Sequence, residues 1–549
     1  MLVTLAASVA ACGGGGGGGG SDAAPAPSPA PAPSTAAPNA AEASRFLAQA
    51  SMGASRAQIA NVQALGYAGW LDAQFAMPAS GTRWDLLVAQ GLTDISNKNS
   101  EAGFDAVAWS KVLGAPDTLR QRVTLALSEI FVTAIDGLVG GGWRQFAAAA
   151  YLDLLEANAF GSHRTLLQQI SQSPAMGQYL TFRASSKANA TSGALPDENY
   201  ARELMQLFTI GLLKLNLDGT PTLTNGKTTE TYGLDDITGL ARVFTGWDFD
   251  LAGLTGAAAT ATPDFIRRPM AQVASRYETG AKSFLGTTIP AGTTAIAGLG
   301  LALDAITTHG NVAPFFSRQL IQRLVTSNPS PAYVARVAGV FNNDGSGARG
   351  NLRAVVRALL LDDEARNAST AAGVTFGKLR EPMLRFAAWA RAFSATSPTG
   401  AWNVGNTSDA GRGLAQSPLR SPTVFNFFRP GYVPPNSPLG NAALVGPELQ
   451  IANESSVVGY INFMQRAVAG AVGDITPDYA SLLAIADTAS ALIDEINLVL
   501  AANQLATATT AALATAVQSM PSGTDTARRN RVNAALVLVL AAPGFIVQK

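Results

Sequence analysis

The stretch Leu195–Leu213, LPDENYARELMQLFTIGLL, carries the clearest folding signal in the chain. Its apolar residues recur about every 3.6 positions, which is the spacing of one face of a helix. This face comprises Tyr200, Leu204, Leu207, Phe208 and Gly211. The opposite arc comprises Glu198, Asn199, Arg202, Glu203 and Gln206. Pro196 and the two acidic residues after it are typical of a helix start. The whole stretch is therefore predicted to form an amphipathic helix packed against a core.

The same periodicity extends outward from this stretch in both directions. Amphipathic segments begin near Ser44 and continue to NRVNAALVLVL at Asn530–Leu540. Alternation typical of strands is scarce, and GAKSFLGTTI at Gly280–Ile289 is the best candidate for a short hairpin. The sequence therefore predicts a mainly α protein, with a large multi-helix body, long loops and at most a small β-hairpin element.

Three loop-rich segments interrupt the helical pattern. They are residues 181–194, residues 215–232 together with 251–292, and residues 396–446. The last contains SPLRSPTVFNFFRPGYVPPNSPLG, which is rich in proline and aromatic residues and is expected to pack on the body. Long loops inside a domain often line functional sites. The alternative is that they are closed by their own side chains.

The N-terminus predicts export and attachment to a lipid. Residues 1–11, MLVTLAASVAA, form an uncharged apolar leader that ends in small residues, as in a lipoprotein-type signal peptide. The only cysteine, Cys12, follows, and Val9–Cys12 resembles the lipobox of bacterial lipoproteins. Gly13 after the cysteine resembles the signal for outer-membrane sorting. Residues 12–39 read as a Gly/Ala/Pro/Ser tether and residues 40–549 as the helical body.

The overall charge excludes some partners. The chain has 38 basic and 38 acidic residues, and this balance argues against general nucleic-acid binding. The late apolar run AALVLVLAA is about half of the length that a membrane span needs. We therefore expect an outer-membrane lipoprotein whose only contact with the membrane is a lipid anchor at Cys12.

Several blocks of the body resemble one bacterial family. They are RFLAQASMG, PDENYARELMQLFTIGL, DDITGLARVFTGW, YETGAKSFLG and SPTVFNFFRPGY. Together, from residue 43 to residue 549, the chain resembles the family named domain of unknown function 1800. The resemblance implies an exported protein that is often encoded beside a sulfatase-like family, and hence a sulfatase-like partner. Tyr277 stands where many relatives have a histidine, so any chemistry of that histidine would be missing here.

Histidines and cysteines are too few for the usual metal sites. Only His163 and His309 accompany the single cysteine, whereas a zinc site usually takes three or four such ligands. We therefore expect no metal and no cofactor. His309 precedes a predicted helix, where a cap or an interhelical hydrogen bond is the expected role and catalysis the alternative.

The segment ENYARE is the candidate for acid–base chemistry. Glu198 and Arg202 are four residues apart, as are Asn199 and Glu203, so these groups share one side of a helix. If that side lined a cleft, the two carboxylates could act as acid and base, as in most glycosidases. The alternative is a solvated face or a network between helices.

Arginines recur on polar faces of the predicted helices. Several that converge would form a pocket for carboxylate, sulfate or phosphate groups. The candidates for such a site are Arg242, Arg318, Arg323 and Lys282. The alternative is dispersed pairing at the surface and between helices.

Two functions follow from these observations. The first is a binding or scaffold role in the cell envelope, with a sulfatase-like partner. The alternative is a hydrolase of envelope or extracellular glycans or esters that uses Glu198, Arg202 and Glu203. An enzyme should bury ENYARE at the floor of a pocket, whereas a scaffold should leave that face filled or flat.

Overall fold

The computed structural model describes residues 37–549. The predicted signal peptide, Cys12 and most of the predicted tether lie outside these residues. The described chain is mainly α-helical, which confirms the predicted fold class. Side-chain caps begin many helices; at α1, Asn39 and Glu42 form a reciprocal capping box.

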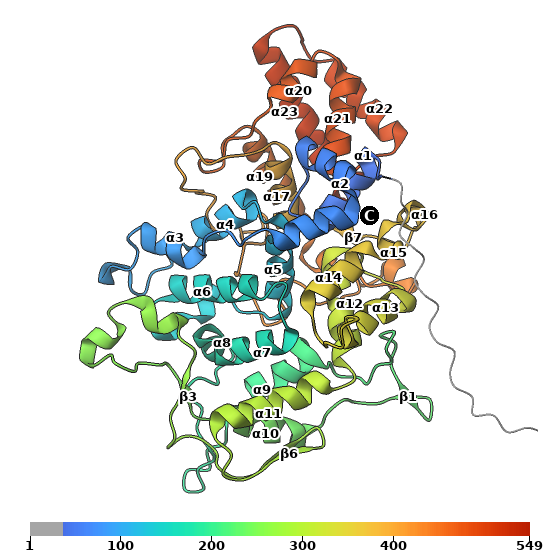
Figure 1. The fold of residues 1–549 in the computed structure, drawn as a ribbon. Coiled ribbons are helices and arrows are strands. Elements are labelled where there is room, and N and C mark those ends of the chain that lie inside the picture. The colour runs from blue at the N-terminus through green and yellow to red at the C-terminus, as the bar shows by residue number, and fades with distance from the viewer. Residues whose placement is uncertain (1–36) are drawn as a thin grey trace, which may run out of the picture. The chain divides into compact units, whose positions relative to one another are not determined.

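The helices run through the whole body (Figure 1). The first ten are α1 (Ala40–Ala50), α2 (Arg56–Ala76), α3 (Arg83–Ala89), α4 (Phe104–Gly114), α5 (Thr118–Ile130), α6 (Arg144–Ala157), α7 (His163–Gln172), α8 (Pro174–Tyr179), α9 (Asn199–Glu203) and α10 (Leu234–Ala241). The next seven are α11 (Ala295–Thr308), α12 (Val312–Leu324), α13 (Pro331–Asn342), α14 (Leu352–Leu361), α15 (Asp363–Arg366), α16 (Ala368–Ala372) and α17 (Pro382–Ala392). The last seven are α18 (Pro438–Asn441), α19 (Glu454–Val468), α20 (Ala480–Ile485), α21 (Ala489–Ala501), α22 (Thr507–Gln518), α23 (Asp525–Ala541) and α24 (Pro543–Ile546).

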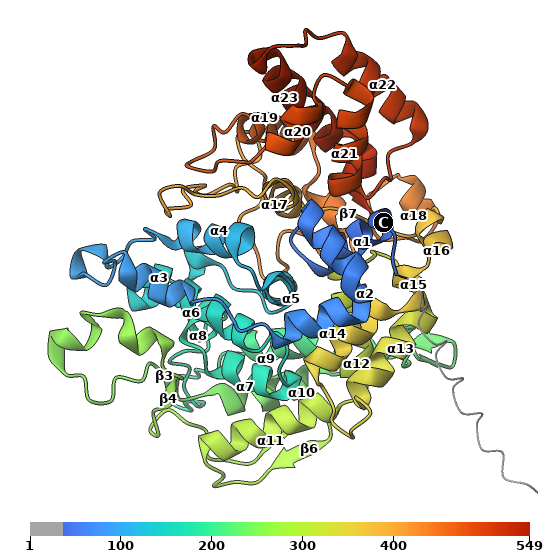
Figure 2. The ribbon, with the colours of Figure 1, turned by 45° about the horizontal axis from the view of Figure 1, so that its top comes forward.

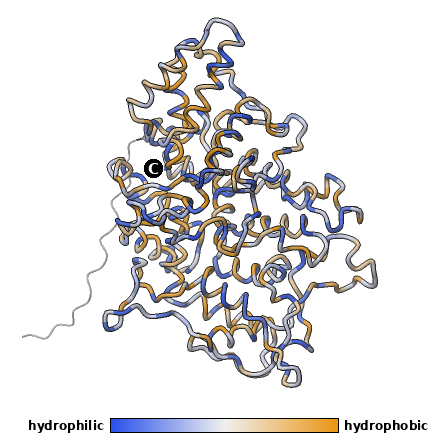
Figure 3. The backbone as a smooth tube through the Cα atoms, turned by 180° about the vertical axis from the view of Figure 1, so that it is seen from behind, coloured by the Kyte–Doolittle hydropathy of each residue, from blue (hydrophilic) through white to orange (hydrophobic). Residues whose placement is uncertain are grey.

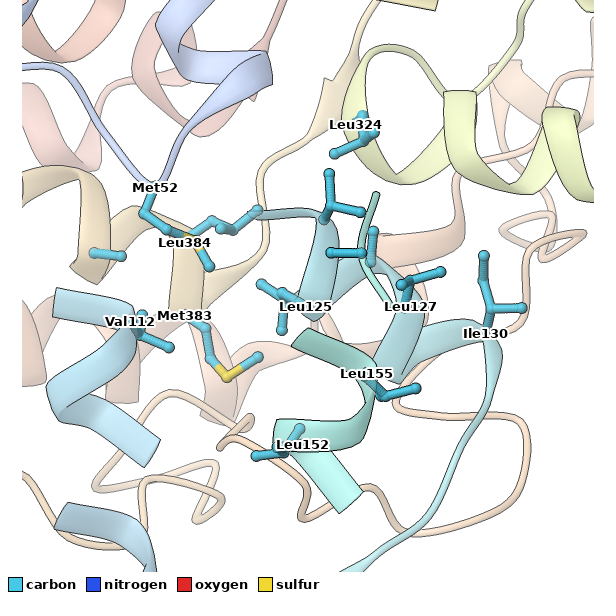
Figure 4. Close-up of a cluster of buried hydrophobic side chains, with 14 of the residues drawn as sticks. Met52, Val112, Leu125, Leu127, Ile130, Leu152, Leu155, Leu324, Met383 and Leu384 are labelled. Carbon is cyan, nitrogen blue, oxygen red and sulfur yellow. The ribbon is translucent and has the colours of Figure 1, made fainter. Parts of the chain in front are cut away.

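Helix α5 lies near the middle of the body in two views (Figures 1 and 2). It packs against α2, α4, α6 and α12, and all but two of its thirteen residues are buried. Figure 4 shows Leu125, Leu127 and Ile130 of this helix together with Leu152 and Leu155 of α6, Leu324 of α12 and Met383 of α17. Because α5 is surrounded on all sides, its charged residues Arg122 and Glu129 are also buried.

The strands form four two-stranded antiparallel pairs. The predicted hairpin is present as β5 (Lys282–Phe284) and β6 (Thr287–Ile289), and a second hairpin joins β1 (Leu223–Thr224) and β2 (Lys227–Thr228). The other pairs join distant segments: β3 (Trp247–Asp248) with β4 (Ala271–Gln272), and β7 (Lys378–Leu379) with β8 (Val547–Gln548). The last pair returns the C-terminus to the segment before α17.

The helix predicted over Leu195–Leu213 is shorter than the periodicity suggested. It begins at Asn199, three residues after Pro196, because the side chain of Asp197 accepts hydrogen bonds from Thr181 Oγ1 and from the backbone of Asn199. From Leu204 to Thr209 the backbone widens into a π-helix. Gly211, with φ +69°, ends it. Most of the predicted apolar face is nevertheless buried, although Leu207 is partly exposed and Glu203 of the opposite arc is buried as well.

Apolar and polar segments are interspersed along the backbone of the body, as amphipathic helices require (Figure 3). Among the described helices, none combines the length and the apolar run that a bilayer crossing requires.

Candidate functional site

An open cleft of about 670 Å³ lies between three segments of the body. One wall is α12, the second is the segment from Gln206 to Pro221, and the third is the loop from Val424 to Val433. The end of α5 contributes Glu129 and Ile130 to the inner wall. This volume is typical of a small-molecule site, and two of the three predicted loop-rich segments line it.

Asn311, just before α12, fixes the second wall to the first. Its side-chain amide donates to the carbonyls of Ile210 (2.9 Å) and Leu213 (2.7 Å). Its side-chain oxygen accepts from the backbone of Leu215 (3.0 Å). One buried residue therefore satisfies three backbone groups of a segment that lies about a hundred positions earlier in the chain.

Gly211 allows the second wall to come close to α12. Its φ of +69° is a left-handed conformation. A Cβ atom at this position would lie 2.6 Å from the ring of Phe315. Phe315 lines the cleft, so the missing side chain of Gly211 lets an aromatic ring form part of the wall.

The third wall is the proline- and aromatic-rich loop. The backbone N–H of Tyr432 donates to the carbonyl of Arg429 (3.0 Å), and the N–H of Gly446 donates to the carbonyl of Tyr432 (2.9 Å). The guanidinium of Arg429 lies 4.6 Å from the centre of the Phe425 ring. These contacts place Phe425, Arg429 and Tyr432 along the cleft.

Two cations in the cleft have no acidic partner. Arg318 on α12 and Arg429 on the loop are exposed, and neither forms an ion pair with any described residue. Partial burial lowers the pKa of Arg318 from its ordinary value, but a guanidinium stays protonated in proteins. Much of the remaining surface is apolar, with Leu207, Val424 and Phe425 among its members. The cleft thus offers positive charge beside an apolar wall.

Arg323, the third arginine of the cleft, is already engaged. It is buried, and its guanidinium donates to the carbonyls of Gln319 (3.1 Å) and Glu129 (2.9 Å). Its Nε lies 3.6 Å from Glu129 Oε2. Among the described residues, Glu129 is the only carboxylic acid in the cleft wall, and both of its carboxyl oxygens are buried. No exposed carboxylate therefore faces the cleft from the described residues.

Behind this wall lies a buried network of charged groups. Lys378 Nζ lies 3.0 Å from Glu448 and 3.6 Å from Glu381, and Gln416 donates to Glu381 (2.7 Å). Burial, then the negative charge of Glu381, raises the pKa of Glu129 well above its usual range. Burial acts to raise the pKa of Glu381 as well, but Lys378 and a hydrogen bond from Glu129 hold it below its usual value. The pKa values of Glu129 and Glu381 are thus shifted in opposite directions.

The ENYARE segment lies apart from this cleft. Glu198 and Arg202 form a half-exposed ion pair of 3.3 Å, and Glu198 also accepts from Thr238 Oγ1 (3.0 Å). Glu203 is buried, and this burial raises the pKa of its carboxyl group. None of the three residues lines a cavity described here. The side of the helix that carries Glu198, Arg202 and Glu203 is therefore occupied by contacts with neighbouring residues, as expected of a contact between helices.

The surroundings of the two histidines indicate structural roles. Nδ1 of His309 accepts from the backbone of Asn311 (3.1 Å), the residue before α12, and burial lowers the pKa of His309. His163 is buried against Phe316 and Phe341. Burial lowers the pKa of His163 to about 3, so its ring is neutral at physiological pH.

The four predicted anion-binding residues separate into two pairs. Arg318 and Arg323 both line the cleft. Arg242 instead lies 3.6 Å from Glu278, and Lys282 is buried with its Nζ 4.7 Å from the centre of the Tyr277 ring. Lys282 Nζ also donates to the carbonyl of Gly280 (3.1 Å). Tyr277 therefore packs against a lysine in the core.

Sequence reasoning missed Glu129, Glu381 and Arg429. Arg122 and Glu129 are seven residues apart in a helical segment, so they share a face with Leu125 and Ala126, and charges on an apolar face are a signal of a buried network. Arg429 stands between Phe428 and Pro430 in a loop. No helical or strand period applies there, so nothing local indicates which wall it joins.

A family model described as "Protein of unknown function (DUF1800)" matches residues 45–547. No curated protein and no solved structure matches the chain. The match therefore supplies no ligand and no reaction.

Proposed function

The chain belongs to the DUF1800 family, and on this premise we propose that it is a binding protein whose cleft takes an anionic ligand with an apolar body. One observation carries the proposal: Arg318 and Arg429, without ion pairs in the described chain, lie in the same partly apolar cleft. A charged guanidinium binds carboxylate and related anions through parallel hydrogen bonds. The apolar wall would bury the rest of the ligand.

The geometry favours binding over hydrolysis. A carboxylate-dependent hydrolase needs an acid or base within hydrogen-bond reach of the substrate. In the described part of the chain, the only carboxyl group in the cleft wall is that of Glu129, and both of its oxygens are buried. Glu198 and Glu203 lie outside this cleft. For the hydrolase alternative, the residues of the ENYARE segment would have to become accessible to a substrate.

The cellular setting of the proposal rests on the N-terminal sequence. A lipid at Cys12 and a tether up to residue 39 would hold the body beside the outer membrane. There the binding role would operate with a sulfatase-like partner. Metabolic labelling with a palmitate analogue should mark the native protein and fail to mark Cys12→Ala. Labelling of both proteins would rule out this anchor.

The binding proposal is tested with an amphipathic anion. Anilinonaphthalene sulfonate carries one negative charge on an aromatic body, and its fluorescence rises in an apolar site. We expect one saturable site whose affinity falls about tenfold in Arg318→Gln or Arg429→Gln, since a hydrogen bond to a charged group contributes about 1.5–3 kcal/mol. Arg412→Gln is the matched control, because Arg412 is exposed and lies outside the cleft.

A competition experiment checks the need for the charge. Dodecanoate should displace the probe at least about tenfold more effectively than dodecanol, which has the same chain without the charge. Equal displacement by both compounds, or unchanged affinity in both cleft arginine variants, would contradict the proposal.

A further inference from the structure

A second, much smaller cavity of about 10 Å³ adjoins the inner wall of the cleft. Glu129 lies in the wall of both cavities. The other side is formed by Thr133, which follows α5, and by Ser421 and Asn426 from the proline- and aromatic-rich loop. The small cavity therefore lies between the central helix and the loop that forms the third wall of the cleft.

Four residues around this small cavity have buried polar atoms without a hydrogen-bond partner in the described chain. These atoms are both carboxyl oxygens of Glu129, the hydroxyls of Thr133 and Ser421, and the side-chain nitrogen of Asn426. All four residues are at least nine-tenths buried. Native proteins rarely leave such groups unsatisfied. These groups therefore still need a partner.

We propose that this cavity is a specific binding site for one water molecule. The volume matches the space that a single water needs, and such a water typically makes about three hydrogen bonds. The polar groups around the cavity also include both hydrogen-bond donors and acceptors, as a bound water molecule requires. The Asn426 nitrogen can only donate, a carboxyl oxygen of Glu129 can accept, and the two hydroxyls can do either.

A metal ion fits this set of groups less well than water does. Water can accept the hydrogen bond of the Asn426 nitrogen, whereas a cation would be repelled by it. The guanidinium of Arg323, with its Nε 3.6 Å from Glu129 Oε2, adds a positive charge beside the cavity. A second cation would have to overcome this repulsion in a buried place.

The water would join the loop to the central helix. The backbone N–H of Ile135 donates directly to the carbonyl of Leu419 (3.0 Å). Hydrogen bonds through the water would add a link from Ser421 and Asn426 to Glu129 and Thr133. Because this loop carries Arg429, the link would also hold one wall of the proposed anion-binding cleft in place. That consequence rests on the proposed function, whereas the water site itself does not.

Crystals of the full chain soaked in a thallium salt provide the first test. We expect one density peak within hydrogen-bond distance of at least three of the four polar side chains, without an anomalous signal. An empty cavity would overturn the proposal. A thallium signal at the peak would overturn it in favour of a monovalent cation.

Thr133→Val provides a test in solution, because valine has the same shape without the hydroxyl. If the hydroxyl binds a water, the variant loses a hydrogen bond and its midpoint of thermal unfolding falls. If the cavity is empty, removal of an unpaired buried hydroxyl raises the midpoint or leaves it unchanged, and the proposal fails. Thr307→Val is the control for a lost protein hydrogen bond, since the Thr307 hydroxyl donates to the carbonyl of Leu303 (2.7 Å). The unfolding of either variant is measured without the anionic ligand, so this result does not depend on the proposed binding function of the cleft.

Discussion

Glu129 on the central helix and Glu381 at the start of α17 are both almost completely buried, and the negative charge of Glu381 raises the pKa of Glu129. Two neighbouring buried carboxylates cannot both ionise at low cost. The electrostatics of the central helix are thus coupled to those of the start of α17.

Glu129→Gln should change how stability depends on pH. The folded-state pKa of Glu129 is raised above its unfolded value of about 4.3, so the folded protein binds more protons than the unfolded chain. This contribution to stability is complete at low pH and is lost as the pH rises through the folded pKa. Glutamine keeps a donor toward Glu381 and cannot ionise. Denaturant unfolding from pH 5 to pH 9 should therefore show the variant gaining stability relative to the wild type as the pH rises. Parallel curves would contradict the raised pKa of Glu129.

Lys378→Met should be strongly destabilising. The side chain of Lys378 is completely buried between Glu448 and Glu381, and its Nζ also donates to the carbonyl of Arg323 (2.8 Å). Removal of one partner of a buried ion pair costs about 3–5 kcal/mol, because the remaining charges stay buried. Chemical denaturation measures this loss.

An exposed ion pair provides the control for Lys378. Arg357 contacts Asp72 at the surface, and exposed pairs contribute about 1 kcal/mol or less. Arg357→Gln should therefore leave the unfolding curve almost unchanged. Equal losses in the two variants would mean that the network around Lys378 is accessible to water.

His163→Leu should make the protein less sensitive to acid. Burial among phenylalanines lowers the pKa of His163 to about 3 in the folded state, against about 6.5 in the unfolded chain. Its contribution to stability is present above pH 6.5 and is lost as the pH falls toward 3. We expect the difference in unfolding free energy between pH 7 and pH 4 to be smaller in the variant. The same difference in both proteins would show that His163 is solvated.

Gly211→Ala should damage the cleft as well as the fold. Alanine is strained at a φ of +69°, and its Cβ would meet the Phe315 ring. We expect a loss of about 1–3 kcal/mol, together with weaker binding of anilinonaphthalene sulfonate.

Gly226→Ala separates backbone strain from the clash. Gly226 has a φ of +75° and no atom within 4 Å of the position of a Cβ. Its replacement should cost about 1 kcal/mol from strain alone and leave probe binding unchanged. Similar binding losses in both variants would mean that Phe315 does not shape the cleft.

The sequence by itself determined the fold class, the family and most of the helical faces. These features are local or periodic, so they are visible in one segment at a time. Tyr200, Leu204 and Phe208 are buried as their spacing predicts. The hairpin at Lys282–Ile289 also formed, because its turn and alternation lie within ten residues.

Only the tertiary structure decided which charged residues meet. Arg318 and Arg429 are more than a hundred positions apart, as are Glu129 and Glu381, and no periodicity connects them. The ENYARE face looked suited to chemistry because its charges are neighbours on one helix, yet the cleft formed where three distant segments pack together. The physical reason is that the burial of each carboxylate or guanidinium depends on the other segments that surround it, and those contacts exist only in the folded chain.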